Sequence, residues 1–213
     1  MKRFIDTLKN IWAIKELRNR LLYTLILLVV FRLGSYIVLP GVMSDVLSNV
    51  AKGRSANDLL GLINIFTGGA FNQASILALG IMPYITASII IQVLGFAVPY
   101  FQRLQQKEGE SGRKKLNQIT RVLTVAITLV QGGAYLTYLK GVGAISPNIA
   151  QSIFWGSNIL ILTTGTVFAM WLGEKITDKG IGNGVSLLIM VGILSRLPQA
   201  FIFEFDAQMA SSG

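Results

Sequence analysis

The sequence predicts an all-α membrane protein with five transmembrane helices and one short re-entrant helix. Of its 213 residues 52% are hydrophobic and only 14% are charged, whereas a soluble domain carries about 25% charged residues. Two long stretches, 59–102 and 141–173, contain no Asp, Glu, Lys or Arg. Because a helix needs about 20 apolar residues to cross the hydrocarbon core of a bilayer, each stretch is long enough for at least one span.

The first 40 residues predict a surface helix followed by a membrane span. Residues 1–20 place Phe4, Leu8, Ile11 and Trp12 on one helical face and basic residues around much of the rest. This pattern is typical of an amphipathic helix on the membrane surface, and a solvated helical arm is the alternative. The apolar run that follows is too long for a signal peptide and lacks a small-residue cleavage site. It predicts a retained first span over 21–40.

The next segment, 41–58, is polar and mixed, which predicts an external loop. Residues 59–73 are apolar but too few to cross a membrane, and paired glycines, Gly68 and Gly69, interrupt them. A short, broken apolar segment predicts a re-entrant or half-length helix. An external loop packed on the helix bundle is the alternative.

The remaining apolar runs predict four more transmembrane helices, joined by short polar segments. The helices are expected over 75–98, 122–139, 153–172 and 184–203. The connections are a cytoplasmic basic loop (99–121), an external loop (140–152), a cytoplasmic turn (173–183) and an external tail (204–213).

The basic residues predict the orientation. With the N-terminus inside, the inner segments hold fourteen Lys and Arg and the outer segments hold four. Cytoplasmic loops of membrane proteins carry such an excess, so the N-terminus is expected to be cytoplasmic. The net charge of +9 is explained in the same way. It favours electrostatic contact with ribosomal RNA over base-specific binding of nucleic acid.

The residues that are absent narrow the function. The chain contains no Cys and no His, so it has neither thiol chemistry nor the commonest general base. A secondary transporter needs ionisable residues within its spans, and an intramembrane enzyme needs a catalytic set there. Apart from Arg32, and Arg196 near the end of the last predicted span, the spans supply neither, which favours a passive channel. Arg32 either pairs with a polar group on a neighbouring helix or extends to the outer surface.

Four separate stretches resemble one family. They are VFRLGSYIVLPG (30–41), NIFTGGAFNQASILALGIMPYITASIIIQVL (64–94), KEGESGRKK (107–115) and TGTVFAMWLGEKITDKGIGNGVSLLI (164–189). From about Arg20 to Pro198 the chain resembles the SecY family, the central subunits of the bacterial Sec translocon. Val38 stands where that family usually has a second proline, which changes only the local stiffness.

The resemblance implies one half of a ten-helix, inverted-repeat channel in the bacterial plasma (inner) membrane. The channel passes unfolded preproteins across the membrane and inserts membrane proteins sideways into it, without catalysis and without a cofactor. A secondary transporter or ion-channel half remains the alternative. The implied partners are the second five-helix half, SecE-type and SecG-type subunits, a ribosome or SecA motor, signal peptides, nascent chains and membrane lipids.

The resemblance also assigns roles to particular residues. Segment 59–73 corresponds to a plug that closes the outer funnel, through Leu60, Ile63, Asn64, Ile65, Phe66, Gly68, Gly69 and Phe71. A pore ring is expected from Ile81, Ile85 and Ile189. Thr86, Ser88 and Gln92 line a lateral gate or make interhelical hydrogen bonds, and their spacing puts Ser88 and Gln92 on one helical face with Ile81 and Ile85. Lys107, Arg113, Lys114 and Lys115 form an auxiliary docking loop for the ribosome or SecA.

Overall fold

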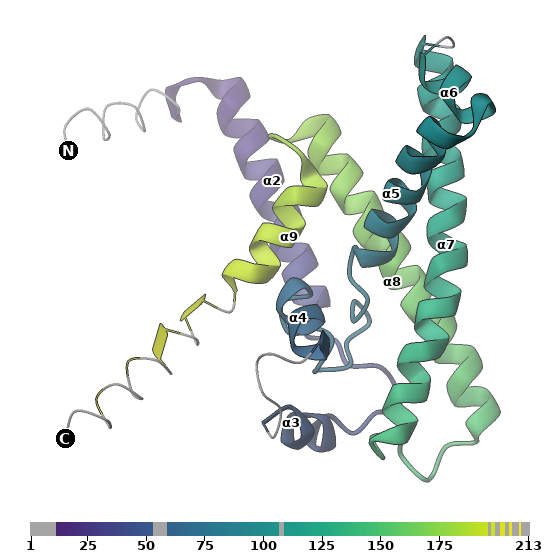
Figure 1. The fold of residues 1–213 in the computed structure, drawn as a ribbon. Coiled ribbons are helices and arrows are strands. Elements are labelled where there is room, and N and C mark those ends of the chain that lie inside the picture. The colour runs from purple at the N-terminus through teal and green to yellow at the C-terminus, as the bar shows by residue number, and fades with distance from the viewer. Residues whose placement is uncertain are drawn as a thin grey trace.

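The computed structural model describes residues 12–52, 59–106, 109–195 and six positions beyond them: 197, 198, 201, 202, 205 and 209. The part of the chain that it describes is helical (Figure 1). The named helices are α2 (Lys15–Gly34), α3 (Ser44–Lys52), α4 (Leu59–Phe66), α5 (Met82–Ala97), α6 (Pro99–Gln106), α7 (Gly109–Gly141), α8 (Gln151–Lys179) and α9 (Gly184–Leu194).

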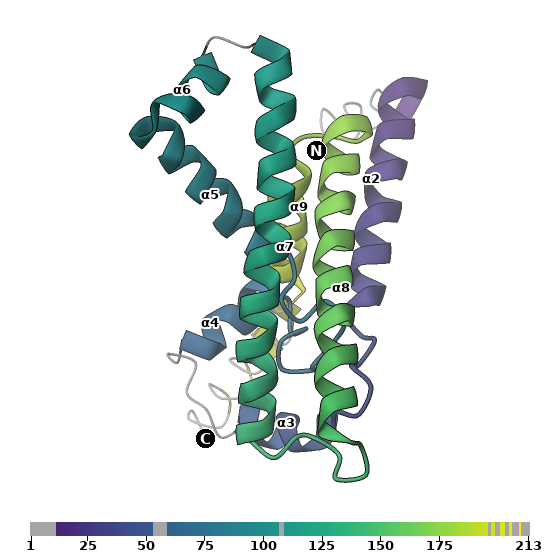
Figure 2. The same ribbon diagram turned by 90° about the vertical axis from the view of Figure 1, so that its right-hand side faces the viewer.

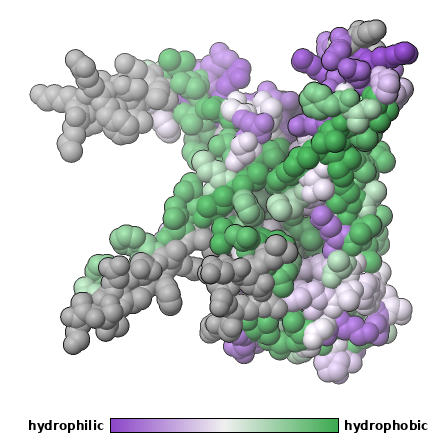
Figure 3. All heavy atoms as spheres, in the orientation of Figure 1, coloured by the Kyte–Doolittle hydropathy of each residue, from purple (hydrophilic) through white to green (hydrophobic). Residues whose placement is uncertain are grey.

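Two long helices, α7 and α8, form the centre of the arrangement. The two helices pack on each other, α5 and α6 pack on α7, and α2 and α9 pack on α8 (Figure 2). The short helix α4 contacts α9. Hydrophobic residues cover the middle of the molecule in Figure 3, and hydrophilic residues gather over the α6 end. This distribution fits a protein whose middle lies in hydrocarbon.

The number of membrane spans stays a prediction. Within the described residues, α7 and α8 are long and apolar enough to cross a membrane, and α5 with α6 would count as a third span if the bent pair is one unit. The apolar helix α9 is shorter than a span as far as the structure describes it. The predicted fifth span, 184–203, extends into residues of which several lie outside the description.

A bend of 101° separates α5 from α6. The break falls at Val98, whose backbone is extended (φ −115°, ψ 120°), directly before Pro99. Proline disfavours the helical conformation in the residue that precedes it. The apolar span therefore ends beside the predicted boundary, and the chain turns sharply into α6.

The segment predicted as a basic loop, 99–121, is helical in its described residues, 99–106 and 109–121. It consists of α6 and the first turns of α7, which continues without a break into the predicted third span. Glu110 and Lys114 are one turn apart, with Lys114 Nζ 3.0 Å from Glu110 Oε1, an arrangement that supports an isolated helix. Similarly, α8 continues to Lys179, so the predicted turn 173–183 shrinks to its last residues.

The predicted second span, 75–98, is helical only from Met82 onward. Residues 67–81 form a series of turns instead. Two residues explain the late start: Gly80 has a left-handed backbone (φ +53°), and Pro83 lies in the first helical turn. Proline is tolerated there but would clash with the carbonyl of residue 79 in a longer helix.

Candidate functional site

The chain reverses its direction after α4, and Asn64 stabilises this reversal. Asn64 is 5% exposed. Its Oδ1 accepts a hydrogen bond from the backbone nitrogen of Asn72 (3.1 Å), and its backbone oxygen accepts one from Gly69 (2.9 Å). Gly68 and Gly69 have left-handed backbones, with φ of +63° and +93°. Glycine adopts this conformation without steric cost, so the paired glycines permit the reversal after α4.

Beyond this reversal, the non-helical stretch pairs with the chain that follows α2. The backbone nitrogen of Leu39 donates to the Ala74 oxygen, and that of Ile76 donates to the Ile37 oxygen, both at 2.8 Å. These bonds satisfy the backbone groups of Ala74 and Ile76 without a helix in this stretch. The Ile76 carbonyl also lies directly against Gly165 of α8, where any side chain would collide with it.

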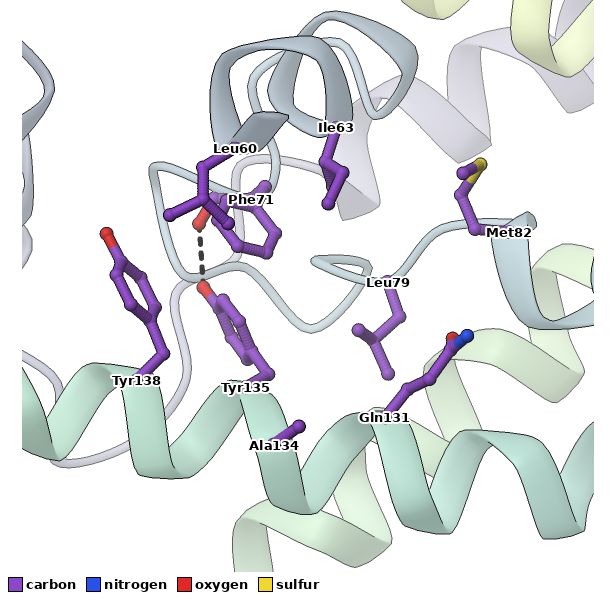
Figure 4. A pocket seen from close by; sticks show the side chains of 9 residues that line it. All are labelled: Leu60, Ile63, Phe71, Leu79, Met82, Gln131, Ala134, Tyr135 and Tyr138. Atoms are coloured by element: carbon purple, nitrogen blue, oxygen red, sulfur yellow. Dashed lines mark hydrogen bonds between the residues drawn. The ribbon is translucent and has the colours of Figure 1, made fainter. Parts of the chain in front are cut away.

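Two side chains from distant helices donate hydrogen bonds to carbonyl oxygens of this segment. Arg32 of α2 donates from Nη1 to the Gly68 oxygen (2.7 Å). Tyr135 of α7 donates from its hydroxyl to the Phe71 oxygen (2.6 Å), as Figure 4 shows. The Phe71 ring packs on Tyr135, with ring centroids 4.8 Å apart. Segment 67–74 is therefore held from both the α2 side and the α7 side.

A cavity of about 300 Å³ lies between α4, the start of α5 and α7 (Figure 4). Its walls are mostly apolar, and Gln131 contributes a polar group. The lining residues are Leu60, Ile63, Phe71, Leu79, Met82, Gln131, Ala134, Tyr135 and Tyr138. The α4 helix is thus not tightly packed against α7 on this face.

The Tyr135 hydrogen bond gives a testable contribution to stability. Replacing Tyr135 with phenylalanine keeps the ring but leaves the buried Phe71 carbonyl without this donor, which should cost about 1–3 kcal/mol. Thermal unfolding of the purified protein in detergent measures the loss. Tyr100→Phe is the matched control, because Tyr100 is exposed and such changes stay within about 0.5 kcal/mol. Equal stability of the two variants would contradict the role of this bond.

The three isoleucines expected to form a pore ring come together in one cluster. Ile81 is 5% exposed, and its Cδ1 packs against the position of Gly173 on α8. Ile85 of α5 and Ile189 of α9 are partly buried against the same cluster. We call it the central cluster; its buried members are Phe31, Leu77, Ile81, Ala169, Leu172, Ile176 and Leu188.

Ile81 lies at the start of α5, at its N-cap position, and its own backbone (φ −97°, ψ 1°) is not helical. Its carbonyl oxygen nevertheless accepts a hydrogen bond from the backbone nitrogen of Ile85, one turn later (3.1 Å). The helical spacing from Ile81 to Ile85 is therefore kept, and the pore ring stays a prediction.

The polar residues of α5 form hydrogen bonds within their own helix. The Thr86 hydroxyl donates to the Met82 carbonyl oxygen (3.1 Å). Gln92 Nε2 donates to the Ser88 hydroxyl (3.4 Å), on the exposed side. A hydroxyl that bonds to the preceding turn satisfies itself without a partner helix. Their assignment to a lateral gate is untested.

The predicted docking residues are exposed on the first turns of α7. Arg113, Lys114 and Lys115 all face away from the bundle, and Lys107 lies outside the described residues. Nearby, Arg121 forms a two-pronged ion pair with Glu174 of α8, through distances of 2.9 and 2.7 Å. In the sequence, Arg121 is one of the basic residues of the 99–121 segment that predict the orientation. Its partner is 53 residues away, and nothing in the local pattern indicates it.

Comparison with known proteins identifies the family of this chain. The model of the SecY family matches residues 75–212, more than half of the chain. The chain belongs to the SecY family. Its relatives are bacterial, and its long apolar helices are those of a membrane protein.

Three SecY relatives illustrate the similarity; each is named protein translocase subunit SecY. The protein of Buchnera aphidicola subsp. Schizaphis graminum is 43% identical, over 90% of this chain and 44% of its own length. That of Staphylococcus carnosus is 43% identical, over 96% and 49%. That of Haemophilus influenzae is 44% identical, over 88% and 42%. The chain spans less than half the length of these relatives.

Solved structures support the same fold. The structure of a protein-conducting channel matches with a TM-score of 0.57 at 21% identity. The match covers 81% of this chain and 35% of the channel chain. Sec61 in a canine ribosome-channel complex gives the same values. A SecY structure described by the role of its plug domain in the closed channel has a TM-score of 0.56 at 22% identity, over 84% and 36% of the two chains.

Proposed function

We propose that this chain forms one half of a protein-conducting channel, which passes unfolded preproteins across the inner membrane and releases membrane segments sideways into lipid. The observation that supports this proposal best is the central cluster. It joins aliphatic side chains of α5 and α9, including Ile85 and Ile189, with Leu77 and Ile81 from the turns that precede α5.

An aliphatic constriction suits the passage of polypeptides for two physical reasons. Branched apolar side chains can close a pore to ions by excluding water when no chain is present. They also offer no hydrogen-bonding groups, so a polypeptide of any sequence meets no strong binding site. We assign no catalytic step to the chain. The driving force comes from a ribosome or a SecA-type motor.

In this proposal α4 and the turns up to residue 74 form the plug. Its support is the combination of a short helix, a left-handed joint at Gly68 and a cavity behind Leu60 and Ile63. The cavity leaves the α4 helix loosely packed on the α7 side, so moving it disrupts fewer contacts than moving a tightly packed helix would.

The proposal requires partners, because a single half cannot enclose a pore. We propose a second five-helix half, small SecE-type and SecG-type subunits, and lipids around the bundle. Signal peptides would leave through a lateral gate beside Thr86, Ser88 and Gln92. The basic residues Arg113, Lys114 and Lys115 would face the cytoplasm with the N-terminus, as the excess of basic residues there predicts, and would contact the ribosome or SecA.

Cross-linking to a preprotein stalled in transit tests the proposal. The chain has no native cysteine, so single cysteines can be introduced at Ile85 or at Ile90 of the complete channel. Ile90 lies about 140° around α5 from Ile85 and is 38% exposed. We expect the preprotein to cross-link at position 85 about five-fold more than at position 90. Equal cross-linking at both positions would contradict the proposal.

A further inference from the structure

Arg32 has an unusual set of partners for a charged residue in an apolar helix. Its Nη1 donates to the Gly68 carbonyl (2.7 Å) and its Nη2 donates to the Tyr36 hydroxyl (2.9 Å). The guanidinium also lies over the Tyr36 ring, 4.8 Å from its centroid. None of the ion pairs found among the described residues involves Arg32. Its charge is therefore held by a backbone carbonyl and a phenol.

Tyr36 orients the guanidinium toward Gly68. The two residues are four apart, so the tyrosine lies one turn beyond the arginine, where α2 has just ended. A planar guanidinium can donate in two fixed directions at once, which a lysine ammonium cannot reproduce. The contact with Tyr36 thus leaves the other edge of the group directed at the Gly68 oxygen.

The acceptor, Gly68, lies between α2 and α9. A Cβ added there would be 3.0 Å from Arg32 Nη1 and 3.0 Å from the Cα of Gly192 in α9. In the opposite direction, a Cβ on Gly192 would be 2.8 Å from the Phe66 oxygen. The end of α4 therefore packs backbone to backbone on the helix that carries Ile189, with Arg32 holding it from the other side.

We propose that Arg32 is a positioning residue that holds the plug segment in its closed position through the Gly68 carbonyl, and that this hydrogen bond must break when the channel opens. This proposal rests on the function proposed above and states how opening of that channel is controlled. A charge-assisted bond to a single carbonyl holds more strongly than a neutral one. Because no acid takes part in it, water can replace the carbonyl when the segment leaves.

The position of the segment can be measured without any transport. A cysteine at Ala70, which is 1% exposed, reports exposure of the segment through its rate of labelling by a thiol reagent in the complete, membrane-embedded channel. Arg32→Met removes the charge and both donors at nearly constant length, and should raise this rate about ten-fold. Arg32→Lys keeps the charge but loses the planar fork of donors, so its labelling rate should fall between those of the Arg32→Met variant and the unaltered channel.

Arg20→Met is the matched control. Arg20 lies on the same helix, but it is exposed and pairs with Glu16 in the preceding turn. A labelling rate for Arg32→Met within about two-fold of this control would overturn the proposal. As a second control, a cysteine placed instead at the fully buried Ala169 of α8 must still be labelled slowly in the Arg32→Met variant. A parallel rise there would also overturn it, because Arg32 would then stabilise the whole bundle and not the segment.

A transport assay distinguishes a failure of this proposal from a failure of the function on which it rests. Preproteins with defective signal sequences should cross the Arg32→Met channel but not the Arg20→Met channel. Faster labelling at position 70 with unchanged selectivity would refute the part of the proposal that concerns opening. If the cross-linking at Ile85 fails while labelling still responds to Arg32, the channel function is wrong but the contact that positions the segment stands.

Discussion

Replacing Gly184 with alanine is expected to destabilise the protein by about 3 kcal/mol, at the upper end of the usual cost of overpacking. A Cβ at this position would collide with the carbonyl oxygen of Gly173 and lie 2.8 Å from both the Gly173 carbonyl carbon and Ile176 Cβ. Two of these atoms belong to the backbone of α8, so no side-chain rotation relieves the clash. Helix α9 must move away from α8, and Ile189 moves with it.

The matched control is Gly156→Ala in α8. A Cβ there would meet nothing within 4 Å, so the substitution should be neutral or should stabilise the protein by about 0.5–1 kcal/mol through the better helix propensity of alanine. Thermal unfolding of both variants in the same detergent measures the difference. Equal melting temperatures would show that α8 and α9 are not in backbone contact at Gly184.

The long helices could be predicted from the sequence because their signal is local. The predicted spans 122–139 and 153–172 lie within α7 and α8, where most residues are apolar and none is charged. The predicted ends of these two helices were wrong, because charged residues were taken to mark loops. The basic residues before Arg121 were expected to form a loop, but Glu110 and Lys114 pair along a continuous helix. Hydropathy marks where the apolar part of a helix stops, and the helix itself can continue in water.

The shape of segment 67–81 could not be predicted, because it depends on contacts distant in sequence. Apolar content alone indicated a span from residue 75. The structure instead pairs Leu39 with Ala74 and Ile37 with Ile76, and packs the Ile76 carbonyl against Gly165. One local signal was present, since Pro83 favours a helix start close to its own position.

The sequence indicated several residues of the candidate site but not the contacts that they make. Arg32 stood out as the lone charge of an apolar run, but its acceptor is the backbone carbonyl of Gly68. Every residue carries a carbonyl, so no sequence pattern indicates which one accepts. Tyr135 was overlooked for the same reason. A tyrosine within an apolar span is a usable signal, because a buried hydroxyl normally finds a partner.

Replacing both Ile85 and Ile189 with glycine is expected to raise the ion leak of the idle channel about ten-fold or more. Both side chains pack against the central cluster from two different helices. In the proposed channel their removal widens the constriction, and the glycines expose backbone polar groups that hold water. A wetted neck conducts small ions, whereas an aliphatic neck excludes them. Ion flux into vesicles that contain the complete channel, without a motor or a preprotein, measures the change.

The matched control for this leak removes the same amount of aliphatic surface from the same helices. Ile90 and Leu194 lie about 140° around α5 and α9 from the two ring positions, and both are exposed, by 38% and 46%. Glycine at these two positions also lowers helix propensity, more at Ile90 within α5 than at Leu194 at the end of α9, but leaves the central cluster intact. If this control leaks as much as the Ile85/Ile189 variant, the leak arises from weakened helices, and the two isoleucines do not form the constriction.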